Sequence, residues 1–378
     1  MNKSEISELR KQIKKGGLVL SDVWCCYVDS EKNRVFTQKE PLEMLTEEKS
    51  DEYYARLKKV LSGALGKNLY NLDFPDSEEA EGGRQHQLWQ LYKSKLDDVA
   101  LVDQFLDKLT REAPIDDHYF VMMVYGAYDV PGYTGNGEAM EDASESVYDF
   151  MLCSICPVKQ TRPFLSYDPY VNGMENKVPD WEVGQPMTGF LFPAFNDRAD
   201  DIHSALYYVS KPGEVSKEMI ESLFGSAVPL SSVAEREGFN QVMSGTPGTM
   251  TGFDEMVSVQ EQIMDMIAEN DSEEAVMLDK EKLSDIMKTA GISEPVIEEA
   301  RQVYDDNIGS LREVMAENVI DVKKIRFQST GIDLRVDAEH MDRVETRTVE
   351  GRRCLLVFVD EPFDMNGVPV IIKEGLDD

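Results

Sequence analysis

The sequence lacks a long apolar run. Nowhere in its 378 residues do apolar side chains approach the roughly 18 in succession that a membrane-spanning helix needs. The first residues, "MNKSEISELRKQIKKGG", also lack the apolar core of a secretory signal. We therefore expect a cytoplasmic protein that has no membrane partner.

Histidine and cysteine are scarce, and motifs for common chemistry are missing. The sequence has four histidines and contains no GxSxG, GxGxxG or GxxxxGK[ST] motif. No motif therefore supports a histidine-based enzyme or a nucleotide-binding protein. The five cysteines are an odd number in apolar runs, which favours buried free thiols in a reducing compartment. Cys153 and Cys156 have CxxC spacing, but no second pair completes a zinc site, and strand residues three apart face opposite sides.

Basic side chains are few as well. With 39 lysines and arginines against 72 aspartates and glutamates, the formal net charge is −33, and such a field repels nucleic acid and anionic lipid. In Asp321–Arg353, however, eight basic residues stand against seven acidic ones. A nucleic-acid partner is expected only through the arginines of this tail, which are Arg326, Arg335, Arg343, Arg347, Arg352 and Arg353.

The N-terminal part is predicted to be helical with one small hairpin. Residues 2–15 have the spacing of an amphipathic helix, and 18–37 have the pattern of a strand, a turn and a returning strand. Residues 46–66 and 84–111 are helical in pattern. The acidic, glycine-bearing link at 74–84 is expected to be an exposed loop.

The middle of the chain predicts a largely antiparallel sheet. Near-continuous apolar, β-branched and aromatic runs favour strands buried on both faces. These runs are 118–130, 147–158, 189–195 and 202–209. A long polar loop is expected at 131–146 and a short helix at 216–225.

The rest of the chain is helical and acidic to about residue 315 and β-rich from about residue 323. The fold class is therefore α+β: a central sheet with N-terminal helices, an acidic helical segment and a β-rich tail. The expected domains are 1–115, 116–230, 231–320 and 321–378.

The stretch "PAFNDRADDIH" (193–203) is a candidate metal site. In a meander, the loops at 130–147 and 196–201 emerge at one end of the sheet, which brings several aspartates and a histidine together. These residues are Asp129, Asp142, Asp197, Asp200, Asp201 and His203. Clustered carboxylates hold hard divalent cations, the chemistry of a metal-dependent hydrolase. The spacing matches no standard motif, however, and hairpin tips prefer Asp and Asn, so an ordinary hairpin tip is the favoured interpretation.

The stretch "EGGRQHQLW" (Glu81–Trp89) loosely resembles the GGQ tip of class-I peptide release factors and their archaeal-type relatives. An arginine separates the glycine pair from Gln85, and acidic residues precede it. The favoured interpretation is a flexible loop that leads into a helix, with a ribosome-associated factor as the alternative.

The chain as a whole resembles an uncharacterised family of Gram-positive gut-type bacteria that is catalogued as a domain of unknown function. The resemblance rests on "LSGALGKNLYNLDF", "AYDVPG", "LCSICPV", "GFLFPAFNDRADDIH", "VPLS" and "VETRTVEGRRCL". It implies a full-length cytoplasmic bacterial protein, and it supplies no activity, cofactor or catalytic residue.

Three functions remain open. The leading one is a non-catalytic protein that binds a protein partner, for which the acidic helical segment suits a basic partner. The second is a metal-dependent hydrolase that uses the aspartate cluster. The third is a ribosome-associated factor with the Gly82–Gln85 loop as its tip and the arginine-rich tail as its RNA contact.

Overall fold

In the computed structural model the described residues are 1–14, 17–133, 139–177, 179–245, 251–272, 274–360 and 362–372. Of residues 133, 139–145 and 177 the backbone alone is described. The chain divides into two units by its internal contacts. They are Met1–Ala234 with Ser272–Glu274, and Glu235–Asp271 with Ala275–Asp378.

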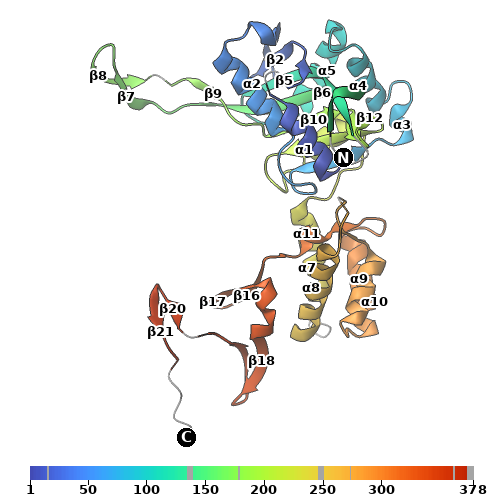
Figure 1. The fold of residues 1–378 in the computed structure, drawn as a ribbon, viewed down its shortest axis with the longest axis vertical. Coiled ribbons are helices and arrows are strands. Elements are labelled where there is room, and N and C mark those ends of the chain that lie inside the picture. The colour runs from blue at the N-terminus through green and yellow to red at the C-terminus, as the bar shows by residue number, and fades with distance from the viewer. Residues whose placement is uncertain are drawn as a thin grey trace. The chain divides into compact units, whose positions relative to one another are not determined.

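The first unit is built on an antiparallel sheet with nine strands in the described residues (Figure 1). Its main path is β3 (Arg34–Glu40), β2 (Val23–Val28), β5 (Tyr119–Tyr133), β6 (Ala139–Gln160), β10 (Thr188–Phe192), β13 (Ser204–Val209) and β4 (Leu69–Asp73). Off this path, β1 (Val19–Leu20) pairs with β5 and β9 (Trp181–Val183) pairs with β6. The four predicted central strands are confirmed as β5, β6, β10 and β13, which are neighbours in this order.

Short helices accompany the sheet. They are α1 (Lys3–Gln12), η1 (Leu42–Met44), α2 (Glu47–Lys59), α3 (Asp76–Glu79), α4 (Arg84–Lys93), α5 (Val99–Glu112) and α6 (Lys217–Leu223). The predicted N-terminal helix begins at a capping box, in which Asn2 Oδ1 accepts from the Glu5 backbone N–H and Glu5 accepts from the Asn2 N–H. None of the described helices has the length and apolar character that crossing a bilayer requires.

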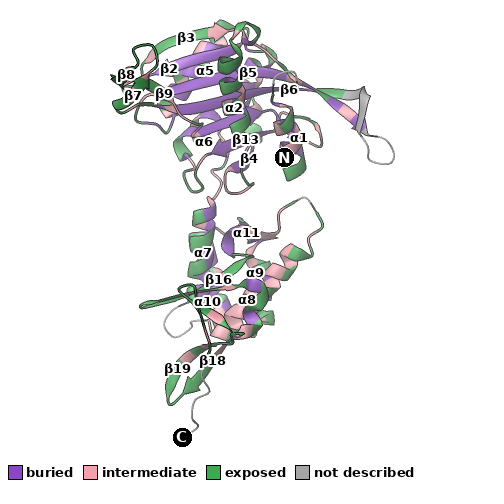
Figure 2. Ribbon diagram, turned by 60° about the vertical axis from the view of Figure 1, so that its left-hand side comes forward, coloured by how far each residue is buried: buried purple, intermediate pink, exposed green. Residues whose placement is uncertain are grey.

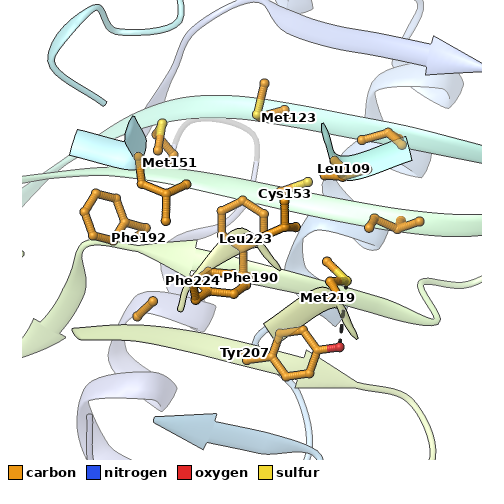
Figure 3. Close-up of a cluster of buried hydrophobic side chains, with 14 of the residues drawn as sticks. Leu109, Met123, Met151, Cys153, Phe190, Phe192, Tyr207, Met219, Leu223 and Phe224 are labelled. Carbon is orange, nitrogen blue, oxygen red and sulfur yellow. Dashed lines mark hydrogen bonds between the residues drawn. The ribbon is translucent and has the colours of Figure 1, made fainter. Parts of the chain in front are cut away.

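The central strands are buried on both faces because helices cover both. Side chains of α4, α5 and α6 form one cluster with alternate strand residues such as Cys153 and Phe190. Side chains of α1 and α2 form a second cluster with the intervening residues, such as Leu152 and Leu191. β10 and β13 are accordingly buried at every residue, and the parts of β5 and β6 that pair at the centre of the sheet are buried as well (Figure 2). In the first cluster the rings of Phe190 and Phe224 meet edge to face, 5.2 Å apart (Figure 3).

The prediction of one helix at 84–111 is wrong. The chain turns between α4 and α5, where Lys95 and Leu96 have φ of +54° and +61°. The Trp24 indole N–H donates to the Leu96 carbonyl (2.9 Å), and the Asp98 side chain caps α5. A buried tertiary contact therefore stabilises two successive residues in the left-handed conformation. Neither is a glycine, so the local sequence does not indicate the turn.

A segment predicted as a loop, and a connector for which no strand was predicted, both contain strands. The hairpin of β5 and β6 extends through most of the predicted loop at 131–146. The connector before β10 contains β7 (Phe164–Asp168), β8 (Gly173–Lys177) and β9. These segments lie beyond the sheet's apolar centre, so they lack the apolar pattern by which the core strands were predicted. The predicted segments 1–115 and 116–230 contribute strands to one sheet.

The second unit contains the predicted acidic helices and the β-rich tail. Its helices are α7 (Ser232–Ser244, from Glu235 on), α8 (Phe253–Ala268), α9 (Lys280–Thr289), α10 (Glu294–Asn307), α11 (Ala316–Val319) and η2 (Ala338–Arg343). Its two-stranded pairs are β14 (Met277–Leu278) with β15 (Val314–Met315), β16 (Lys324–Ser329) with β17 (Ile332–Asp337), β18 (Val344–Val349) with β19 (Arg352–Val357), and β20 (Phe363–Met365) with β21 (Val368–Val370).

One carboxyl group is buried in this second unit. Glu235 lies on α7 and accepts a hydrogen bond from Asn318 Nδ2 (2.7 Å), and both residues are buried. Burial raises the pKa of Glu235 to about 7, although hydrogen bonds from Asn318 and from the Met315 backbone act in the opposite direction. The folded protein therefore holds a proton here at a pH where the unfolded chain has released it.

Gly189→Ala is expected to lower the free energy of unfolding by about 1–3 kcal/mol, because the site has no room for a methyl group. A Cβ at Gly189 would stand 2.4 Å from the Cys153 carbonyl oxygen and 2.9 Å from Cγ2 of Val60, the C-cap residue of α2. Urea unfolding measures the change. Gly173→Ala is the control, since its Cβ would meet nothing nearer than 3.9 Å. Equal losses in the two variants would contradict the tight approach of α2 to β10.

Stability is expected to fall as pH rises from about 4.5 to about 7, by about 3 kcal/mol from Glu235 alone, because the native state binds the extra proton in that window. Glu235→Gln keeps an acceptor for Asn318 and removes the titration. Urea unfolding at several pH values should therefore show a flatter profile for the variant than for the parent chain. Superimposable profiles would show that Glu235 does not titrate in this range.

Candidate functional site

The stretch predicted as a hairpin tip forms a hairpin. β11 (Ala194–Asn196) pairs with β12 (Ala199–Asp201) between β10 and β13. The two turn residues, Asp197 and Arg198, have φ of +51° and +59°, as a two-residue type I′ turn requires. Neither is a glycine, so contacts elsewhere must hold this turn.

Arg198 provides those contacts. Its guanidinium donates to both carboxylate oxygens of Glu8 on α1 (3.0 and 3.2 Å) and to the carbonyl of Pro131 on β5 (2.9 Å). The Tyr128 hydroxyl donates to the same Glu8 carboxylate (2.9 Å). The Arg198 and Glu8 side chains are 22% and 19% exposed, so the pair is only partly screened by solvent. The β11–β12 hairpin and the distal part of β5 therefore lie at one end of the sheet, as the meander predicts.

The predicted metal ligands are distributed around this end. Asp201 accepts from Asn196 Nδ2 (2.6 Å) and from the His203 backbone N–H (3.0 Å). Asp197, Asp200 and Asp129 are exposed, Asp129 on β5 opposite Val147.

The side chain of Asp142 lies outside the described residues. In the part of the chain whose side chains are described, no three His, Cys, Asp or Glu side chains are grouped to hold a metal ion. The metal site stays a prediction, and metal analysis of the native protein is its direct test.

His203 makes its shortest polar contact with α3. Its Nδ1 lies 2.6 Å from Glu79 Oε1, and this hydrogen bond raises the pKa of His203. The resulting stabilisation is present below the ordinary histidine pKa and is lost as pH rises through the raised value. The imidazole is 63% exposed, so the pair contributes little.

The Gly82–Gln85 loop has a structural explanation. Gly82 has φ of +89°, and a Cβ at Gly83 would stand 2.2 Å from the Glu78 carbonyl oxygen. Arg84 donates to the Glu78 carboxylate from its backbone N–H (2.8 Å) and from Nη1 (2.6 Å). The Gln85 side chain is buried and donates to the Ile202 carbonyl (2.9 Å). A ribosomal tip requires an exposed glutamine, and here the amide faces inward.

A groove of about 340 Å³ lies beside this loop, between α4 and α5. Its basic side chains are Arg84, His86 and Lys108. Arg84 is paired with Glu78, Lys108 Nζ donates to Gln87 Oε1 (3.1 Å), and a His86 ring nitrogen lies 3.0 Å from Gln90 Nε2. Arg84, Lys108 and His86 therefore each have a polar partner in the groove or beside it.

The CxxC cysteines lie on opposite faces of β6, as predicted. Cys153 belongs to the cluster under α4, α5 and α6, and Cys156 to the cluster under α1 and α2. Burial raises the pKa of Cys156 to about 11 and that of Cys153 still further. Both groups are therefore protonated, unreactive thiols at neutral pH.

Most tail arginines face a carboxylate of their own or a neighbouring strand. Arg326 pairs with Asp333 in two hydrogen bonds (2.9 and 2.6 Å). The other ion pairs are Arg335–Asp333, Arg343–Asp360 and Arg347–Glu345. Arg352 and Arg353, at the β18–β19 turn, have no ion pair with a described residue. A nucleic-acid partner bound through the tail arginines stays a prediction.

The residues that organise the hairpin end were not predicted from the sequence. Arg198 stands inside "PAFNDRADDIH", yet its partner Glu8 is 190 positions away. No local spacing links two such residues. Covariation between the two positions is the signal that would find them.

Arg198→Ala is expected to lower the free energy of unfolding by about 2 kcal/mol, because it leaves the half-buried Glu8 carboxylate without its cation. Arginine and alanine both carry a Cβ, so the positive φ at position 198 strains the backbone equally in the two proteins. The change in the free energy of unfolding therefore reports the lost contacts. Asp200→Ala, in the same hairpin, is the control and is expected to change stability by less than about 0.5 kcal/mol. Denaturant unfolding distinguishes the two. A neutral Arg198→Ala would show that the hairpin is held by its apolar contacts alone.

Comparison with known proteins gives a family and no activity. No curated protein matches the chain. The family model described as "Domain of unknown function (DUF4317)" matches residues 1–368. This match confirms the resemblance inferred from the sequence. Because it takes in nearly all of the 378 residues, the chain belongs to the DUF4317 family.

Proposed function

We propose that the chain is a non-catalytic cytoplasmic protein that acts by binding a basic segment of another protein. The proposed binding surface is the exposed side of α8, α9 and α10. The observation that carries the proposal is the excess of exposed carboxylates on these three helices.

Exposed acidic residues are spread over all three helices and the C-cap of α8. They are Asp254, Glu261, Asp265, Glu269, Glu281, Asp285, Glu294, Glu298 and Asp306. The exposed basic residues of the same helices are Lys282 and Lys288. Two further cations are already used, since Lys280 pairs with Asp305 (2.7 Å) and Arg301 with Glu281. The surface therefore presents a strongly negative field to an approaching partner.

α8 adds partly exposed apolar side chains to this field. Of its 16 residues only Val259 and Ile263 are buried. Half-buried apolar residues flank them, namely Met256, Val257, Met264, Met266 and Ile267. Methionine side chains are flexible and polarisable, so they adapt to varied apolar surfaces. Acidic groups around methionines suit an amphipathic helix with a basic face.

Reversing two charges on α8 is expected to weaken binding of a synthetic basic amphipathic peptide by at least about tenfold. The variant is Glu261→Lys with Asp265→Lys, two exposed residues one turn apart on the same helix. Calorimetric titration at low ionic strength measures the affinity. Added salt is expected to weaken binding to the parent chain, because it screens exposed charges.

A matched control separates the surface from the net charge. Glu48→Lys with Asp51→Lys changes two exposed residues of α2 in the first unit and shifts the net charge by the same amount. The proposal requires the α8 variant to lose affinity while the α2 variant keeps it. Equal losses in both variants would mean that the peptide responds to the overall charge, and the proposal would then fail.

A further inference from the structure

The hairpin of β7 and β8 projects from the sheet of the first unit as a two-stranded arm (Figure 1). We call Phe164–Lys177 the β7–β8 arm. β9 pairs with the end of β6 at the root of the arm. At the turn, Asp168 Oδ1 accepts from the Tyr170 N–H (2.7 Å), and the Tyr167 hydroxyl donates to Asn172 Oδ1 (2.7 Å). The arm is therefore an ordered hairpin with a defined register.

Its register separates an uncharged face from a charged one. Leu165 is opposite Asn176 and Tyr167 is opposite Met174, so these four residues share one face. We call this the apolar face of the arm. Asp168 and Glu175 lie on the opposite face, because side chains alternate along each strand.

The apolar face is uncovered. Leu165, Tyr167 and Met174 are 62%, 56% and 60% exposed, and Tyr170 at the turn is 98% exposed. Leu165, Tyr167 and Met174 leave on the order of 300 Å² of mostly apolar surface in water, and the exposed turn residues Tyr170 and Val171 add to the apolar surface of the arm. This is less than the roughly 800 Å² that each partner buries in a standard interface, so a contact through the arm is expected to be weak and reversible. Moreover, an isolated two-stranded hairpin is only marginally stable in water.

The absence of charged side chains on the apolar face indicates which partner it binds. A basic partner would find no carboxylate on the apolar face, whereas an identical uncharged face complements it without an unpaired charge. Two copies that each carry −33 repel. The arm projects beyond the sheet, so contact through it keeps the two sheets apart, which limits this repulsion.

We propose that two copies of the chain associate through their β7–β8 arms, apolar face against apolar face. A two-fold axis relates the arms, so that the patch of Leu165, Tyr167 and Met174 meets the same patch of the second copy. This interface is separate from the acidic helices of the second unit, so either proposal can fail without the other.

Sedimentation equilibrium of the full chain over a concentration series tests the interface. We expect a monomer–dimer equilibrium that tightens with added salt, because salt screens the repulsion between the two acidic copies. This dependence is opposite in sign to that expected for a basic partner. Leu165→Glu should weaken dimerisation at least about tenfold. The matched control is Phe164→Glu, an adjacent exposed residue on the other face, which should leave it unchanged.

Cross-linking provides a second readout that does not depend on loss of binding. In a Cys354→Ser background the remaining cysteines are buried. A short bismaleimide should then link two copies through Met174→Cys and not through Glu175→Cys on the opposite face. A monomer at every concentration, or a dimer that Leu165→Glu leaves intact, would overturn the proposal. So would equal cross-linking at the two positions.

Discussion

Burial of one sheet on both faces is the constraint on which the first unit depends. Strands such as β10 and β13 are buried at every residue, so neither face can be left to solvent. Helices α1 and α2 must cover one face, and α4, α5 and α6 the other. The close approach of α2 to Gly189, and the turn held by Trp24 between α4 and α5, are consequences of this requirement. The same burial keeps the thiols of Cys153 and Cys156 protonated and inaccessible to reactants.

The features that suit recognition lie outside this closed core. The β7–β8 arm projects from the sheet with its apolar face exposed, and the acidic helices belong to the second unit. In α8 two residues of sixteen are buried and most of the others are half-buried, so its packing is looser than that of the central strands. Binding to the arm or to α8 would therefore leave the core packing undisturbed.

The sequence predicted what local patterns encode. Continuous apolar runs predicted the four central strands, and amphipathic spacing predicted the N-terminal helix that the structure has as α1. The helix break at Lys95 and Leu96 was missed, because a distant indole rather than a local residue stabilises it. The sequence placed the β11–β12 turn and the distal β5 segment together, but it did not reveal the Arg198–Glu8 pair. Pairs this far apart leave no signal in a single sequence.

Hydrogen exchange of the full chain, with and without the basic amphipathic peptide, tests the proposed binding surface most directly. The account predicts slowed amide exchange that is confined to Phe253–Asn307, the segment that holds α8, α9 and α10. Slowed exchange at the β11–β12 hairpin or along the α4–α5 groove would contradict it. Unchanged exchange throughout the chain at saturating peptide would contradict it as well.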